Sequence, residues 1–169
     1  ASRAAYPKMS SEYWPDGSTK KIAQPDGVYA LFGYDDARRL TSIADSEGNA
    51  IVYTLTGNGD REKEEIFDTT GTPRRKLSRT YNTLGQLETV SLPHPNPAIT
   101  TPVTTSYHYD LEGNLDKVTD ALSHETHSLY DPLGRLKRTV QNATAVATAT
   151  DRSETAFVYD ALDSPTTVT

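Results

Sequence analysis

The sequence contains no cysteine, so disulfide bonds and a thiol nucleophile are both excluded. Hydrophobic residues make up only 35% of its 169 residues, and the ten glycines do not raise this to the roughly 45–50% usual in globular chains when glycine is counted. No apolar run reaches the length of about 18 residues that a membrane-spanning helix needs. A leader in which charged residues precede an apolar stretch is also missing. We therefore expect neither a membrane span nor a signal peptide in these residues.

Helical signals are scarce as well. No window of 11–18 residues places apolar residues at the 3.6-residue spacing of an amphipathic helix. Ten tyrosines and many threonines supply side chains that suit half-buried, pleated surfaces instead. The predicted fold class is all-β.

Acidic residues outnumber basic ones, 23 to 17, which gives a formal net charge of −6 at pH 7. This disfavours a nucleic-acid surface, which needs clustered Lys and Arg. The basic cluster Arg74-Arg75-Lys76 follows an acidic run, Glu62-Lys63-Glu64-Glu65, and this predicts a solvated strand face of mixed charge. His124 and His127 are three residues apart, whereas the zinc motif of metalloproteases needs histidines four apart on a helix. We predict no metal and no cofactor.

What the sequence does have is a short phrase that recurs at intervals of tens of residues, as in repeat architectures. The phrase is an aromatic residue, Asp or Asn, two variable residues, Gly, one variable residue and Leu. Its fullest copies are Tyr81-Asn82-Thr83-Leu84-Gly85-Gln86-Leu87, Tyr109-Asp110-Leu111-Glu112-Gly113-Asn114-Leu115 and Tyr130-Asp131-Pro132-Leu133-Gly134-Arg135-Leu136. Two degraded copies begin at Tyr34-Asp35, with Arg38 in the Gly position and Leu40 at the end, and at Tyr159-Asp160, with Asp163 and Pro165 there.

Asp or Asn followed three residues later by Gly is the preference of a type I β-turn in which Gly takes the left-handed conformation of a bulge. In such a hairpin the residue before Asp faces the residue two after Gly, so Tyr130 should lie opposite Leu136. An aromatic–aliphatic pair of this kind contributes roughly 0.2–1 kcal/mol. Each phrase therefore predicts a β-hairpin closed by a Tyr–Leu pair.

Branched residues follow nine positions after the first tyrosines, at Ile43, Val90 and Val118. This odd spacing breaks the alternation that starts at the leucine. Either these residues face the other side of the sheet or a bulge intervenes.

The sequence predicts two regions. Residues 1–33, with the turns Pro15-Asp16-Gly17 and Pro25-Asp26-Gly27, are expected to form irregular hairpins of the same sheet, and residues 34–169 form the repeat region. Two biased stretches, near 91–106 and 141–155, are expected to be loops because Pro cannot donate to a ladder and Ala/Thr composition cannot build a core. The Ala/Thr stretch has the alternative of one long strand. The chain begins without Met and stops inside a repeat, so we expect a piece of a longer protein.

The Tyr-Asp-x-x-Gly-x-Leu phrase resembles the YD repeats of the Rhs (rearrangement hotspot) family, over Tyr34 to Val168. The resemblance implies a β-sheet that spirals into a hollow shell, which in bacterial members encloses a C-terminal toxin and in relatives forms part of Tc toxin cocoons or teneurin-type receptors. It also implies a bacterial protein that is secreted, for instance by type VI secretion, or displayed on the cell surface. Partners would then be the rest of the shell, the toxin, and secretion proteins or glycans.

The sequence offers few candidates for catalytic residues. Asp131-Pro132-Leu133-Gly134 matches the Asp-Pro-x-Gly string at which some Rhs proteins cleave themselves, but a turn explains it fully, since self-proteolysis needs a second carboxylate. We expect no enzyme activity. The leading hypothesis is a structural shell segment, and the alternative is a carbohydrate- or protein-binding module. Cut ends should also leave edge strands that favour self-association.

Overall fold

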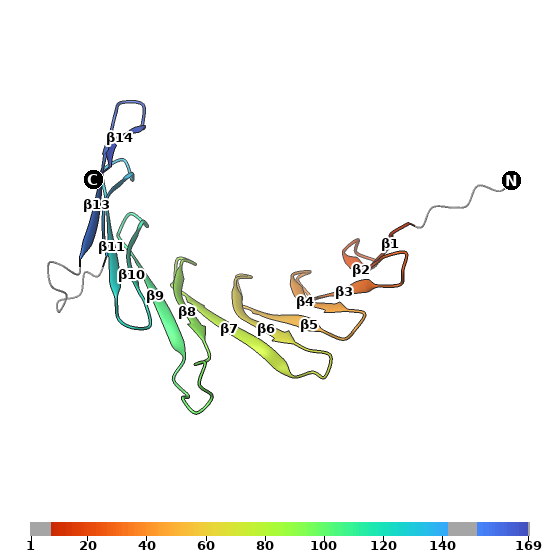
Figure 1. Cartoon of the computed structure of the whole chain (residues 1–169). Coiled ribbons are helices and arrows are strands. Elements are labelled where there is room, and N and C mark those ends of the chain that lie inside the picture. Colours follow the sequence, from red (N-terminus) through yellow and green to blue (C-terminus); the bar gives the residue numbers. More distant parts are fainter. Residues whose placement is uncertain (1–7, 142–151, 169) are drawn as a thin grey trace. The chain divides into compact units, whose positions relative to one another are not determined.

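The computed structural model describes residues 8–141 and 152–168, and these residues form strands and turns without a helix. Fourteen antiparallel strands follow one another in chain order within one sheet (Figure 1). This confirms the all-β prediction. No helix in these ranges is long and apolar enough to cross a membrane.

Two compact units divide the chain within β7, after Arg79. The strands of the first unit are β1 (Ser10–Tyr13), β2 (Thr19–Ala23), β3 (Tyr29–Tyr34), β4 (Leu40–Asp45), β5 (Ala50–Leu55), β6 (Arg61–Phe67) and most of β7 (Pro73–Tyr81). The second unit holds β8 (Leu87–Leu92), β9 (Val103–Tyr109), β10 (Leu115–Thr119), β11 (Glu125–Tyr130), β12 (Leu136–Gln141), β13 (Ser153–Tyr159) and β14 (Pro165–Val168).

The strand registers place the residues of the repeat phrase opposite one another. Tyr109 pairs with Leu115, and Tyr130 pairs with Leu136, as the turn pattern predicted. In both hairpins the register shifts directly after the leucine, which leaves Asp116 as an extra residue after Leu115. This bulge puts Val118 opposite Tyr107 and therefore on the tyrosine face. The bulge is thus the correct one of the two explanations for the odd nine-residue spacing.

The sheet is a single layer with almost no core. Among the described residues the buried hydrophobic side chains are Tyr53, 9% exposed, and Leu77, 8% exposed, and no polar side chain is buried. Both side chains lie on the same face of the sheet in the first unit, because Tyr53 pairs with Glu64 and Glu64 pairs with Leu77. The Arg61 guanidinium lies 4.1 Å from the centre of the Tyr53 ring and covers it. Half-buried side chains, not a packed interior, therefore make up most of both sheet faces.

The predicted loop inserts are shorter than expected. The connection between β8 and β9 covers only residues 93–102, because Ser91 and Leu92 extend β8 and pair with Thr104 and Val103. The Ser91 and Thr104 hydroxyls form a 2.8 Å hydrogen bond that favours this pairing. In the second insert Gln141 ends β12 and pairs with Ser153 of β13. Most of that insert, including the Ala/Thr stretch with its two alternatives, lies outside the described residues.

Residues 8–33 form hairpins with the same turn chemistry as the later ones. Gly17 donates its N–H to the carbonyl of Trp14 at 2.9 Å, and Gly27 donates to Gln24 at 3.1 Å. The irregularity expected in this region is therefore not seen in the turns themselves. Residues 1–7 lie outside the described ranges.

Candidate functional surface

The Asp or Asn of each phrase caps its own turn. The side-chain oxygen of Asn82 accepts the N–H groups of Leu84 and Gln86, each at 3.0 Å. Asp131 accepts the N–H groups of Leu133 and Arg135 at the same distances. These bonds satisfy backbone donors that would otherwise point to solvent at the tip of a turn. The recurring acidic or amide residue is thus accounted for by turn formation.

Hydrogen bonds hold the turn carboxylates in their charged form. The Asn114 side chain, above all, lowers the pKa of Asp110, and the Arg135 guanidinium lowers the pKa of Asp131. Both carboxylates therefore stay ionised through mildly acidic pH. These turns lie at the same end of the strands, in a row that we call the turn edge of the sheet, and this row carries fixed negative charge.

The fourth turn position is left-handed whether or not it is glycine. Gly134 has a φ of 76°, and the substitutes in the degraded copies, Arg38 and Asp163, have φ values of 63° and 62°. A further turn, from Asp120 to Ser123, follows the same pattern with Ser123 at 66°. The repeat phrase does not predict this turn, because the turn lacks both the tyrosine and the glycine. Its remaining signal is an Asp whose carboxylate accepts two N–H groups at 2.8 Å.

The tyrosines do more than close their own hairpins. The Tyr130 hydroxyl donates to the carbonyl of Leu115 at 2.9 Å, and the Tyr159 hydroxyl donates to the carbonyl of Leu136 at 2.7 Å. In each case the acceptor is the leucine that closes the preceding hairpin. The tyrosine therefore ties one repeat to the repeat before it, a role that the pair pattern within one phrase does not reveal.

A second set of contacts runs along the edge of the sheet from turn to turn. We call these contacts the turn ladder. The Arg39 Nη1 donates to the carbonyls of Thr56 and Gly57 at 3.1 and 3.0 Å. The Gln86 side chain donates to the carbonyl of Gly113 at 3.3 Å, and Arg135 pairs with Asp163 at 2.6 Å. Each donor is the variable residue after the glycine position, so this position links neighbouring hairpins.

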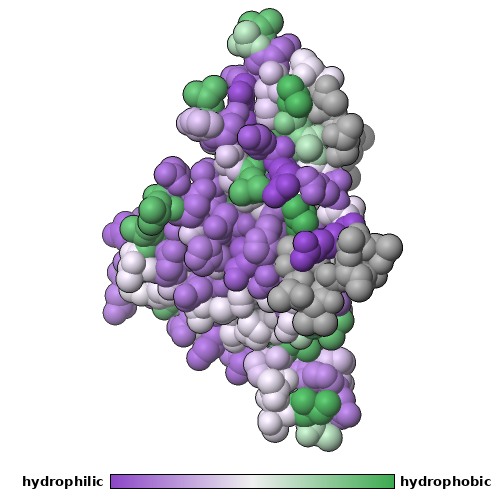
Figure 2. Space-filling model, turned by 90° about the vertical axis from the view of Figure 1, so that its left-hand side faces the viewer, coloured by the Kyte–Doolittle hydropathy of each residue, from purple (hydrophilic) through white to green (hydrophobic). Residues whose placement is uncertain are grey.

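The face opposite the tyrosines is polar in the second unit. His108 and Asp116 are 2.6 Å apart, and the Lys117 and His127 side chains both pair with Glu125, at 3.5 and 2.9 Å. Figure 2 shows hydrophilic residues over most of the visible surface, with hydrophobic residues in separate patches. Such a face is compatible with water and does not require a covering layer.

The Asp131-Pro132-Leu133-Gly134 string, which was expected to be a turn, forms one, with the Gly134 N–H donating to the carbonyl of Asp131 at 2.9 Å. The Arg135 guanidinium sits between two carboxylates, at 2.7 Å from Asp131 and 2.6 Å from Asp163. An acid–base dyad needs two carboxylates that share one proton, whereas here a guanidinium lies between the two carboxylates. His124 pairs with Asp120 and His127 with Glu125, both at 2.9 Å. Within the described ranges no three His, Asp or Glu side chains are placed to hold a metal ion.

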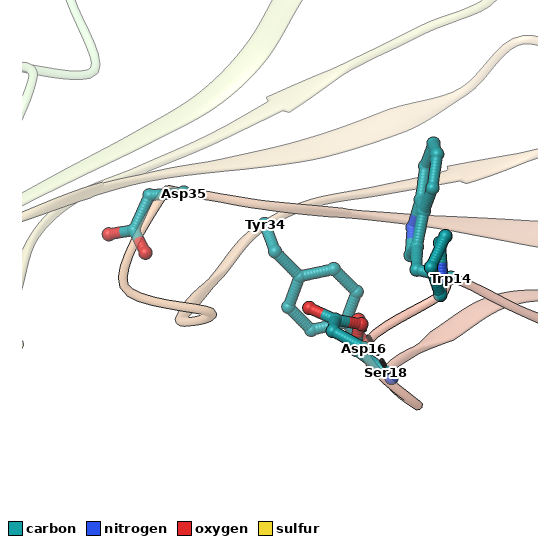
Figure 3. Close-up of a pocket in the computed structure, with 6 residues that line it drawn as sticks. Trp14, Asp16, Ser18, Tyr34 and Asp35 are labelled. Atoms are coloured by element: carbon teal, nitrogen blue, oxygen red, sulfur yellow. Dashed lines mark hydrogen bonds between the residues drawn. The ribbon is translucent and has the colours of Figure 1, made fainter.

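One open cleft in the first unit combines aromatic and carboxylate side chains. It has a volume of about 360 Å³ and is lined by Trp14, Pro15, Asp16, Ser18, Tyr34 and Asp35. Figure 3 shows the Tyr34 ring between Trp14 and Asp35. Asp16 and Asp35 are turn caps, and hydrogen bonds from Ser18 and from the Arg39 backbone, respectively, lower their pKa.

No protein-family model matches the chain, and no curated protein matches it in sequence. Solved structures do match. A chain of the crystal structure of TcdB2–TccC3–Cdc42 is 15% identical with a TM-score of 0.67, over 90% of this chain and 8% of that chain. The crystal structure of TcdB2–TccC3–TEV gives 16% identity and a TM-score of 0.64, over 93% of this chain and 9% of that chain. The chain shares the fold of a segment of these TcdB2–TccC3 chains.

A third match is the Photorhabdus luminescens Tc holotoxin pore, at 14% identity and a TM-score of 0.51, over 90% of this chain and 10% of that chain. The chain thus spans about a tenth of the length of the chains that it resembles. What is shared is the fold, an Rhs-like sheet of consecutive hairpins. This agrees with the shell fold that the resemblance to Rhs proteins implied.

Proposed function

We propose that this chain is a non-catalytic segment of an Rhs-type shell that encloses a C-terminal toxin and helps to deliver it. The observation that carries the proposal is the single-layer sheet, in which only Tyr53 and Leu77 are buried among the described hydrophobic residues. A wall needs this property, because one face of it must border a lumen while the other borders the outside.

The energetics of the repeats support a role inside a larger assembly. An isolated hairpin is marginally stable in water, and a repeat gains stability chiefly from its neighbours. Here the tyrosine hydroxyl bonds and the turn ladder join consecutive hairpins. Such a sheet can be extended at both ends by further repeats of the same kind.

Imaging the full-length parent protein by electron cryo-microscopy tests the proposal. We expect a hollow β-shell with density for a cargo inside it, and limited proteolysis should leave the cargo intact until the shell is unfolded. A solid globular domain, or a cargo that is cut as quickly as a free toxin domain, would contradict the proposal. Fractionation of the producing bacteria would test export, for which the type VI route is one hypothesis.

The cleft at Trp14 favours a second candidate function, a carbohydrate-binding module. Aromatic rings provide flat apolar surfaces for sugar rings, and the carboxylates of Asp16 and Asp35 provide hydrogen-bond acceptors. Glycan-array binding that is lost in Trp14→Ala would support this function. Tyr107→Ala and Tyr109→Ala test whether the tyrosine face of β9 contributes. Absence of binding by the wild-type chain would dismiss the candidate.

A further inference from the structure

Four leucines stand at turn tips at one end of the strands in the second unit and are largely exposed, and a fifth, Leu122, stands at a turn tip at the other end. Leu84, Leu111, Leu133 and Leu162 are 80%, 102%, 73% and 86% exposed. They contrast with the leucines that close the hairpins, such as Leu115, which is half-buried and pairs with Tyr109. Turn tips favour Gly, Pro, Asn, Asp and Ser, and the turn itself gains nothing from leucine. Turn formation therefore does not account for these four side chains.

All four leucines lie on the same turn edge of the sheet, at one end of its strands. They belong to the turns that follow β7, β9, β11 and β13, and antiparallel strands return the chain to the same edge after every second strand. Figure 1 shows these four turns in succession along that edge. Neighbouring tips are roughly 10 Å apart, because each hairpin adds two strands at about 4.8 Å per strand. We call this row the leucine rim.

The leucine rim is confined to the second unit. The corresponding turns of the first unit carry Pro15-Asp16, Asp36-Ala37 and Gly57-Asn58 at the same tip positions. A general demand of the hairpin would place leucine in both units. The rim is therefore a local property of the sheet between β7 and β14.

Acidic side chains flank the rim. Its four turns carry five carboxylates and one guanidinium, Arg135, which leaves four net negative charges; the carboxylates are Asp110, Glu112, Asp131, Asp160 and Asp163. The lowered pKa values of Asp110 and Asp131 keep two of these charges in place in mild acid. Exposed apolar groups between fixed negative charges suit a partner that is apolar and positively charged.

We propose that the leucine rim is a docking surface for a cationic amphipathic polypeptide segment. The leucines insert between apolar side chains of the segment, and the flanking carboxylates pair with its Lys and Arg residues. Two identical acidic rims repel one another, which disfavours a second copy of this chain as the partner. The negative charge likewise disfavours an anionic membrane surface.

The test measures binding of labelled amphipathic peptides to the full chain by fluorescence anisotropy. The probe is a Leu/Lys peptide of about 20 residues, which as a helix spans the roughly 30 Å of the rim, and the matched control is the same peptide with Glu in place of Lys. We expect the Leu/Lys peptide to bind, with an affinity that falls as salt rises. The variant with Leu84, Leu111, Leu133 and Leu162 all changed to Ser should bind more weakly by about tenfold or more.

Leu122→Ser provides the matched control within the protein. Leu122 is 77% exposed at a turn tip on the opposite edge of the sheet, so its replacement should leave binding unchanged. All five positions are exposed, and circular dichroism checks that each variant keeps its β-sheet. The proposal is overturned if the wild-type chain does not bind the Leu/Lys peptide at about 100 µM. It is also overturned if the fourfold variant binds that peptide as well as the wild-type chain does. If that variant keeps peptide binding but loses self-association or binding to phosphatidylcholine vesicles, the rim serves a second copy or a membrane, and the proposal is likewise overturned.

Discussion

Replacement of Gly134 by Ala isolates the backbone cost of the repeat turn. Gly134 has a φ of 76°, in the left-handed region. A Cβ built at this position meets only the Asn114 side-chain oxygen, at 3.9 Å, which is an ordinary contact. Steric crowding by neighbours is therefore negligible, and the change in free energy comes from the backbone conformation and from the unfolded chain.

The expected magnitude follows from these two contributions. A residue with a Cβ pays about 1–2 kcal/mol in the left-handed region. Ala recovers roughly 0.4–1 kcal/mol because it restricts the unfolded chain more than glycine does. We therefore expect Gly134→Ala to destabilise the β11–β12 hairpin by about 1 kcal/mol, which is about a fivefold change in its opening equilibrium.

Native-state hydrogen exchange read by mass spectrometry measures this change, because local opening is reported segment by segment. Exchange of residues 126–141 should speed up by about fivefold. Gly57→Ala is the control, since Gly57 is outside the left-handed region and an added Cβ meets nothing within 4 Å. Ser123→Gly is the reverse test and should slow exchange around its turn. Unchanged or slower exchange in Gly134→Ala would refute the reasoning.

Three further predictions follow from the contacts of the turns. The pKa of Asp131 is lower in the folded state, so its stabilising contribution is complete above the unfolded value of about 4 and is lost as pH falls through the lower folded value. Amide exchange or NMR shifts followed from about pH 5 to about pH 2 should show loosening at Asp131 but not at the Asn82 turn. Equal responses of the two turns would contradict this. Tyr159→Phe removes a 2.7 Å hydrogen bond and should destabilise β13 by about 1 kcal/mol, measured by urea unfolding; no shift in midpoint would show that water replaces the hydroxyl at no cost. Gln86→Ala removes a turn-ladder contact, so exchange of the amides near Gly113, 27 residues away, should rise, and a change restricted to its own turn would exclude coupling along the edge.

The local part of this structure is readable from the sequence because its causes are local. Asp or Asn bonds its own turn, glycine takes the left-handed position, and these two choices fix the register that sets Tyr130 opposite Leu136. The bulge after each leucine was one of two open alternatives, because side-chain alternation alone does not reveal which strand carries the extra residue. The predicted loop bounds near 91–106 were wrong because β8 and β9 continue into this stretch, where the Ser91 and Thr104 hydroxyls form a hydrogen bond.

The sequence by itself determined that the chain forms consecutive β-hairpins, since each phrase carries its own turn and its own closing pair. Only the tertiary structure decided what these hairpins do to one another. The tyrosine hydroxyl bonds, the turn ladder and the common edge of Leu84, Leu111, Leu133 and Leu162 all join residues from different hairpins. Such contacts depend on which strand lies beside which, and that arrangement arises when the strands pair, not within any single phrase.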